Sequence, residues 1–279
     1  AAVVRELLGA ERAAVAAGAT LTRHFPARPD DAVEQAALLA TIVAERPSAI
    51  LFAPADDVAL AGPVATAAAA GLPLIGFVNR MPGPFVSFIG ADDVAMGQRI
   101  AEVMIAALGG QGEVVLIEGP DSAPTSRDRG RGFRAAIAAA PGIRLLDSAP
   151  GRYLREPGAA AMAGLLTHHP RIAGAICGND LMALGALEAL AAAGRHALVV
   201  GNNGTADALR AIGEGRLLAS MGFDGFRMGA LAAMAALRHL AGAPVPREIL
   251  LPAPVIDAGN WRDFLAPPEA RPLPAWLDE

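Results

Sequence analysis

Polar side chains stand directly after short apolar runs at three points of the chain, and their groups could bind a small hydroxylated molecule. These side chains are Asn79, Arg80, Asn179, Asp180 and Asn203. An amide group donates and accepts hydrogen bonds at once, which suits sugar hydroxyls. The alternative role for these residues is helix capping and turn formation, and Asp180 fits that alternative best.

Two arginines and the single tyrosine are further candidates. Arg127 and Arg129 lie in residues 119–131, the most polar stretch of the chain, which we expect to form a loop before a helix that begins at Phe133. A guanidinium group can bind a hydroxyl pair or a carboxylate through two N–H groups, but surface salt bridges fit these arginines equally well. Tyr153 could stack on a ligand ring or pack as an ordinary aromatic residue.

The common motifs of enzymes and metal sites are missing from the sequence. It contains no G-x-x-x-x-G-K-[ST], no G-x-S-x-G, no H-E-x-x-H, and no Cys or His pair at metal-binding spacing. These absences remove the common nucleotide and metal mechanisms. We therefore expect a protein that is not an enzyme and has no cofactor and no metal site.

The composition fits a chain with two hydrophobic cores. Its length of 279 residues is typical of two domains, and its hydrophobic fraction of 53% is ample for two buried cores. The formal net charge of -5 and the absence of any basic run argue against a nucleic-acid surface. The chain has no uninterrupted apolar run of membrane-spanning length.

Residues 171–203 carry the pattern that organises the chain. An apolar run at 172–177, a helical pattern at 180–193 and a second apolar run at 198–201 predict a βαβ unit with parallel strands. Residues 46–80 repeat this order. Because ligands bind outside the carboxyl ends of strands in open parallel sheets, the polar residues after these strands are expected to share a site.

Strands and helices alternate along the rest of the chain, which predicts the α/β class with parallel sheets. The chain opens with a predicted helix, 1–18, and residues 19–25 alternate like a strand. Since a doubly wound domain usually opens with a strand, we expect the first strand of this one to be absent. The proline-rich residues 257–279 are expected to lie along the surface of one half.

Four segments together resemble type 1 periplasmic binding proteins of the ribose-binding kind, the sugar-capturing subunits of ABC importers. They are FVNR (77–80), SRDRGRGF (126–133), CGNDLMALGALEAL (177–190) and VVGNNGT (199–205). The resemblance covers nearly the whole chain, in order, and is most specific at NDLMALGAL. It implies two doubly wound parallel-sheet lobes joined by a hinge, with a sugar clamped between them.

The resemblance also implies lobe boundaries and ligand contacts. Lobe one would comprise residues 1–90 and 224–251, without its first strand, and lobe two residues 91–223 and 252–279. The implied ligand contacts are Asn79, Arg80, Arg129, Tyr153, Asn179, Asn203 and Phe223.

The chain departs from the ribose-binding pattern at two of these positions. Asn79 and Asn203 stand where that pattern has aspartates, whereas Arg80 and Arg129 remain. This implies a more positive pocket, suited to a ligand with a carboxylate or phosphate or to a polyol read mainly by amides. The alternative is that a nearby carboxylate, such as Asp92 or Asp224, restores the balance.

The resemblance implies a solute-binding protein of an ABC importer that binds a sugar, polyol or sugar derivative in the cleft between the lobes. Such a protein would be a periplasmic monomer whose partners are the carbohydrate ligand and a membrane permease, without nucleic acid. Two alternatives remain open. One is the ligand-sensing domain of a lactose-repressor-type transcription regulator without its DNA-binding head, and the other is an enzyme, such as a transferase, that uses the same cleft.

The implied mechanism is closure around the ligand, without chemistry. A bound ligand bridges the lobes, and its added contacts favour the closed state. On this basis we expect Arg129→Ala to weaken ligand binding at least tenfold and to leave the melting temperature of the free protein nearly unchanged.

Overall fold

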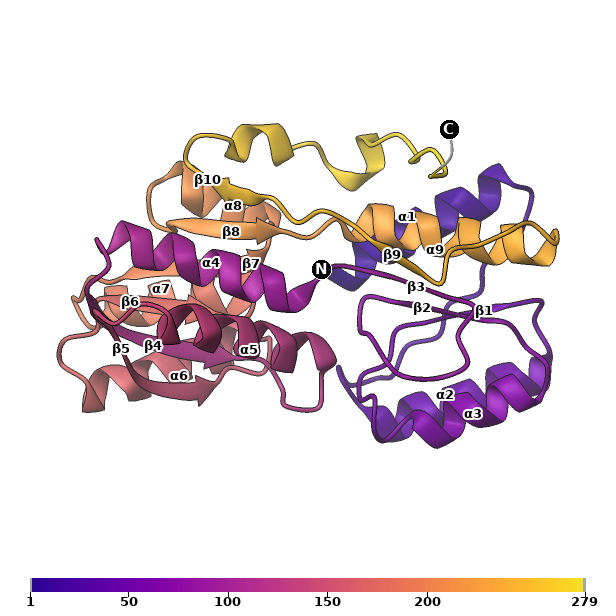
Figure 1. Ribbon diagram of the computed structural model, residues 1–279, viewed down its shortest axis with the longest axis horizontal. Helices are drawn as coiled ribbons and strands as arrows, with labels where there is room; N and C mark the ends of the chain where they lie inside the picture. The colour runs from indigo at the N-terminus through magenta and orange to yellow at the C-terminus, as the bar shows by residue number, and fades with distance from the viewer. Residues whose placement is uncertain (1, 278–279) are drawn as a thin grey trace.

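The computed structural model describes residues 2–277 and has two lobes, each built on its own sheet (Figure 1). Lobe one surrounds a four-stranded sheet of order β1-β2-β3-β9, in which every pairing is parallel. Its strands are β1 (Ile50–Phe52), β2 (Leu74–Phe77), β3 (Ser87–Gly90) and β9 (Glu248–Leu250). Its helices are α1 (Ala2–Ala16), α2 (Ala32–Glu45), α3 (Ala61–Ala69) and α9 (Gly225–Leu240). Figure 1 shows α1 and α9 on one face of this sheet and α2 and α3 on the other.

Lobe two surrounds a six-stranded sheet of order β10-β8-β7-β6-β4-β5, parallel except for β10, which runs antiparallel to β8. Its strands are β4 (Gly112–Glu118), β5 (Ile143–Pro150), β6 (Gly174–Cys177), β7 (Leu198–Asn203), β8 (Ala219–Gly222) and β10 (Val255–Asp257). Its helices are α4 (Asp93–Ala107), α5 (Pro124–Ala138), α6 (Arg155–His168), α7 (Asp180–Ala192) and α8 (Ala206–Gly213). The predicted α/β fold with parallel sheets is confirmed. No helix between residues 2 and 277 has both the length and the hydropathy of a membrane span.

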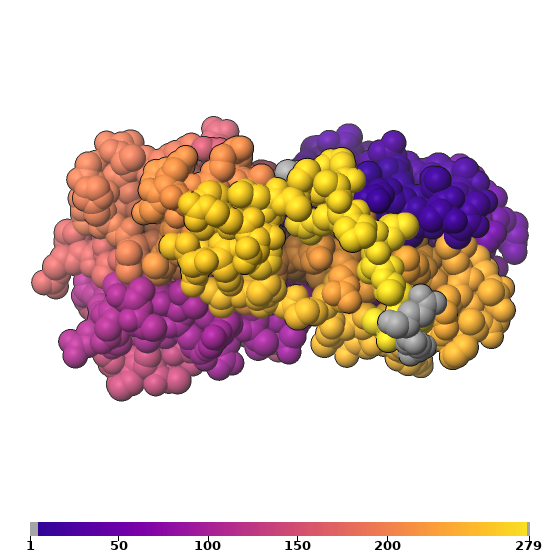
Figure 2. Space-filling view, turned by 90° about the horizontal axis from the view of Figure 1, so that it is seen from above, coloured from indigo at the N-terminus to yellow at the C-terminus, as the bar shows by residue number. Residues whose placement is uncertain are grey.

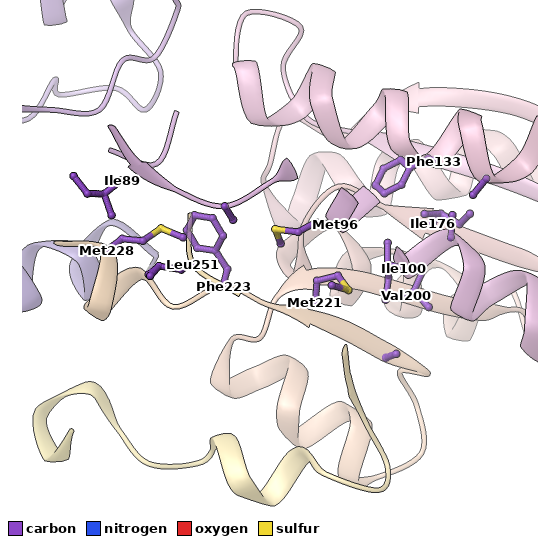
Figure 3. Packing of buried hydrophobic residues seen from close by; sticks show 14 of the residues in the cluster. Ile89, Met96, Ile100, Phe133, Ile176, Val200, Met221, Phe223, Met228 and Leu251 are labelled. Carbon is purple, nitrogen blue, oxygen red and sulfur yellow. The ribbon is translucent and has the colours of Figure 1, made fainter. Parts of the chain in front are cut away.

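The chain passes between the two sheets three times, after β3, after β8 and after β9. The crossings are packed, because one cluster of buried apolar residues continues across them. Figure 3 shows Ile89, Phe223, Met228 and Leu251 together on one side of this cluster and Met96 farther toward lobe two. The crossing segments therefore form a shared apolar joint between the lobes.

Two predicted elements differ from the structure. Residues 19–25 form no strand, since a strand needs a hydrogen-bonded neighbour and no strand within residues 2–277 pairs with this segment. The helix expected to begin at Phe133 begins at Pro124 instead. Its first turns are polar but buried, Thr125 and Ser126 included, so a search for an apolar face could not detect them.

The carboxyl-terminal segment contacts both lobes (Figures 1 and 2). The short helix η1 (Trp261–Phe264) packs against α8 of lobe two, and η2 (Pro268–Ala270) packs against α1 of lobe one. Arg12 of α1 donates a hydrogen bond through Nη1 to the backbone oxygen of Arg271 at 2.7 Å. The helix η2 and Arg271 thus contact lobe one, whereas residues 252–279 were expected to belong to lobe two; residues 278 and 279 lie outside the described part.

Helices α1 and α9 approach each other closely because glycines stand at their contact. A Cβ atom added at Gly9 would lie 1.9 Å from the backbone oxygen of Phe226. One added at Gly229 would lie 1.7 Å from the backbone oxygen of Glu6. Small buried side chains pack in the same contact, namely Ala10, Ala13, Ala230 and Ala233.

We predict that Gly229→Ala lowers the free energy of unfolding by about 1–3 kcal/mol, because the added methyl group must push α1 away from α9. Urea denaturation measures this change. The control is Gly62→Ala in α3, where an added Cβ meets no atom within 4 Å. That variant should keep or gain stability, by up to about 1 kcal/mol. A Gly229→Ala protein as stable as the native one would contradict the close packing.

Candidate ligand-binding site

Arg129 of α5 is a buried guanidinium group, with only 3% of its side chain exposed. Its Nε donates to Oδ1 of Asp93 at 2.7 Å. Its Nη1 donates to the backbone oxygen of Gly178 at 2.8 Å and to Oδ1 of Asn203 at 3.0 Å. The ring centroid of Phe223 lies 5.5 Å from its central carbon. One side chain thus connects α4, the ends of β6 and β7, and the crossing after β8.

The position of Arg129 depends on a glycine in the neighbouring helix. A Cβ atom at Gly97 of α4 would lie 2.2 Å from the backbone oxygen of Arg129, so only glycine allows α4 and α5 to come this close. Asp93 stands in the first turn of α4, directly after the capping residue Asp92. Burial raises the pKa of the Asp93 carboxyl, and the adjacent guanidinium offsets part of this rise. No pattern in the sequence indicates the role of Asp93, because a place beside a helix cap gives no sign of an ion pair.

Tyr153 and Asn179 lie beside this group. The hydroxyl oxygens of Tyr153 and Thr125 are 3.1 Å apart, and burial raises the pKa of Tyr153, so its hydroxyl stays neutral. Asn179 donates through Nδ2 to the backbone oxygen of Tyr153 at 3.0 Å. Its Oδ1 accepts the N–H of Met182 at 2.9 Å, which makes Asn179 the cap of α7. The capping role that fitted Asp180 best in the sequence belongs to Asn179.

Asp180 holds the loop that follows β7. Its Oδ1 accepts the hydroxyl of Ser220 at 2.6 Å, and its Oδ2 accepts the N–H of Thr205 at 2.7 Å. Gly201 makes room for it, because a Cβ there would lie 2.5 Å from Oδ1 of Asp180. Burial raises the pKa of this carboxyl to about 6, although its hydrogen bonds act in the opposite direction. The carboxylate supports the backbone next to Asn203.

Lobe one contributes Asn79, which follows β2. Its Nδ2 donates to the backbone oxygen of Pro54 at 2.8 Å, and its Oδ1 accepts the N–H of Thr125 in lobe two at 3.4 Å. The preceding residue, Val78, has φ +65°, a conformation that a β-branched residue rarely adopts. The chain thus turns sharply at the point where Asn79 meets the other lobe, and such strained turns cluster at functional sites.

Arg80 lies apart from this group. Its guanidinium pairs with Glu248 and lies 4.6 Å from the ring centroid of Phe88, both within lobe one. Half of its side chain is exposed. Of the seven ligand contacts that we expected, the other six lie in two adjoining groups, one linked through Thr125 and one around Arg129, which meet at the backbone of Gly178 beside Asn179. They are Asn79, Arg129, Tyr153, Asn179, Asn203 and Phe223.

The charges of the two arginines are balanced. Arg129 pairs with Asp93 and Arg80 pairs with Glu248, so the pairing does not support the expected excess of positive charge. The two carboxylates expected to restore the balance are helix caps instead: Asp92 caps α4 and Asp224 caps α9. A cavity of about 190 Å³ at the crossings is lined by Asn203 and Phe223 and by residues of both lobes. Asn79, Arg129, Tyr153 and Asn179 do not line this cavity. Within residues 2–277, no group of three or more His, Cys, Asp or Glu side chains could hold a metal ion.

Comparison with known proteins identifies relatives along most of the chain. Residues 7–244 match the family model described as a periplasmic binding protein domain. The ribose import binding protein of Escherichia coli is 37% identical over 175 residues, which are 62% of this chain and 58% of that protein, less than two thirds of its length. The ribose import binding protein of Bacillus subtilis is 30% identical over 224 residues, which are 80% of this chain and 73% of that protein.

A solved structure extends the similarity to the fold. The ABC transporter solute binding protein from Mycobacterium smegmatis with bound glycerol superposes with a TM-score of 0.87 at 28% identity. The match covers 95% of this chain and 92% of that one. Together with the family model, it confirms the resemblance drawn from the four sequence segments. The chain belongs to the periplasmic binding protein family and has the type 1 fold of its ribose-binding members.

Proposed function

We propose that this protein is the solute-binding component of an ABC importer and binds a neutral sugar or polyol between its lobes. The observation that carries the proposal is the gathering of amide, hydroxyl and guanidinium groups at the ends of β2, β6 and β7. Asn79 enters this set from lobe one, and Arg129 and Asn203 enter it from lobe two. The carboxyl ends of parallel strands are where this kind of fold binds ligands.

Free hydrogen-bonding groups at the site suit hydroxyl groups. Arg129 uses Nε and Nη1 within the protein, and its Nη2 makes no hydrogen bond to the part of the chain that the structure describes. The Nδ2 of Asn203 is likewise without a partner among residues 2–277. These groups donate hydrogen bonds, and the Phe223 ring offers an apolar face for the carbon side of a sugar.

The paired arginines favour a neutral ligand over a sugar acid or phosphate. A carboxylate or phosphate binds best to a guanidinium that has no other anion, because each pairing consumes its charge. Asp93 already neutralises Arg129 at 2.7 Å, and Glu248 neutralises Arg80. The relatives agree, since two are named for ribose import and the solved neighbour holds glycerol.

The binding mechanism in this proposal is closure of the lobes about the three crossings. Lobe one comprises residues 1–90 and 224–251, lobe two comprises residues 91–223 and 252–267, and the segment from 268 links them. The ligand bridges the lobes, and each well-made hydrogen bond adds about 0.5–1.5 kcal/mol to the closed state. In this role the protein acts without a cofactor, as a periplasmic monomer that delivers its ligand to a membrane permease. The named relatives are import binding proteins, which favours transport over regulation or catalysis.

Isothermal titration with a panel of neutral and acidic ligands tests the proposal. D-Ribose, D-allose, xylitol and glycerol form the neutral arm, and D-galacturonate and ribose 5-phosphate form the acidic arm. We expect at least one neutral compound to bind and to raise the melting temperature. At a hundredfold excess over Kd, the bound ligand adds about 2.7 kcal/mol to the free energy of unfolding. Binding of the acidic compounds alone would contradict the neutral site, and binding of none, with no sugar retained on native purification, would contradict the function.

Arg129→Ala is predicted to destabilise the free protein, which revises the sequence-based expectation of an unchanged melting temperature. The substitution leaves Asp93 buried without its partner, at a cost of about 3–5 kcal/mol. Urea denaturation measures the effect. Arg134→Ala is the control, because Arg134 pairs with Glu118 in a half-exposed position and should lose no more than about 1 kcal/mol. Equal stability of the two variants would show that the Arg129 pair is not buried as described.

Asp180 is predicted to make stability depend on pH. Burial raises its pKa to about 6, from roughly 3.9 in an unfolded chain. The folded protein therefore binds the proton more readily, and stability from this group grows as the pH falls through 6. Between about pH 7.5 and pH 5, the native protein should gain about 1 kcal/mol relative to Asp180→Asn. Urea denaturation across this range measures the difference, and a constant difference would contradict the raised pKa.

A further inference from the structure

An ion pair joins the two lobes at the start of α5. Nη2 of Arg127, in the first turn of α5, lies 2.8 Å from Oδ1 and 2.8 Å from Oδ2 of Asp57. Asp57 belongs to lobe one, in the turn between β1 and α3. Figure 1 shows the start of α5 on the side of lobe two that faces lobe one. The pair therefore spans the gap between the lobes, at a distance from the crossings.

Contacts within each lobe hold the two partners of the pair in place. Nη1 of Arg127 donates to the backbone oxygens of Asp121 at 2.9 Å and Ser122 at 3.0 Å, which fixes the guanidinium against its own loop. On the other side, Asp56 accepts the N–H groups of the next residues of the turn and closes it. Asp57 is left to face lobe two, with 17% of its side chain exposed.

The pair lies beside the ligand site without belonging to it. Arg127 precedes Arg129 by two residues, and residues at this spacing point to nearly opposite sides of a helix. Arg129 faces the buried site, whereas Arg127 faces lobe one at the rim. The hydrogen bond from the N–H of Thr125 to Asn79 crosses between the lobes at the same turn of α5.

We propose that Arg127 and Asp57 are positioning residues that form a latch: they hold the lobes closed and so raise ligand affinity without touching the ligand. This inference rests on the proposed closure function. When the lobes part, the two side chains separate and become hydrated, so the pair stabilises only the closed arrangement. Because Arg127 is more than one third exposed, the effect is modest, about three- to fivefold in the ratio of closed to open molecules.

Energy transfer between dyes on the two lobes tests the latch in the free protein, with no ligand needed. Thr66→Cys in α3 and Thr167→Cys in α6 provide exposed attachment sites, and the buried Cys177 stays unlabelled. We expect Asp57→Asn and Arg127→Gln each to lower the closed-to-open ratio about three- to fivefold. The double variant should lower it no further than either single one, because both remove the same interaction.

The chain offers a matched control in Glu118→Gln. Glu118 and Arg134 form a bidentate pair at 2.6 and 2.7 Å, with similar exposure, but both belong to lobe two. Its loss should leave the distance between the lobes unchanged. Exchanging the partners, with Asp57→Arg and Arg127→Asp together, should restore closure. Molar salt should lower the closed-to-open ratio of the native protein to that of the single variants.

An unchanged distance distribution in Asp57→Asn, or an equal change in Glu118→Gln, would overturn the latch. Titration of D-ribose, D-allose and xylitol into the same variants separates this inference from the proposed function. If a compound binds but Asp57→Asn does not change the distance between the lobes, the proposed function stands and the latch is contradicted. Lobes that open in the variants while none of the compounds binds would support the latch and remove this choice of ligand class.

Discussion

The site depends on one buried ion pair, between Arg129 and Asp93. A guanidinium group cannot remain in a protein interior unless a carboxylate and further acceptors satisfy it. Here the acceptors are the backbone oxygen of Gly178 and the amide oxygen of Asn203. The need to satisfy one charge therefore aligns α4, α5 and the ends of two strands, and it leaves Nη2 of Arg129 for the ligand that we propose.

Close backbone approach makes this arrangement possible. Gly97 lets α4 pass α5 beside Arg129, and Gly201 makes space for Asp180 between α7 and β7. Asp180 in turn holds Thr205 and Ser220, which flank the loop of Asn203. The polar side chains of the site are thus fixed by groups that no ligand would contact, as a preorganised site requires.

The two lobes meet in two chemically different ways. At the crossings they share apolar packing around residues such as Ile89, Phe223 and Leu251. Breaking this packing would expose apolar surface to water, which is unfavourable. At the rim of the site they meet through polar contacts, the pair of Arg127 with Asp57 and the hydrogen bond of Asn79. Apolar joints stay packed while hydrated polar contacts exchange readily, so the opening that we propose would take place at the rim.

The sequence by itself determined the α/β class, the parallel strands and the polar residues at their ends, because apolar periodicity and strand-end chemistry are local properties. The start of α5 was predicted too late in the chain, because the polar first turns of this helix are buried, and no pattern indicated the role of Asp93. Only the tertiary structure decided that Arg80 turns to Glu248 and that Asp57 meets Arg127. These pairings join residues up to 168 positions apart, taken from 80 to 248, and no local pattern specifies which charge finds which partner.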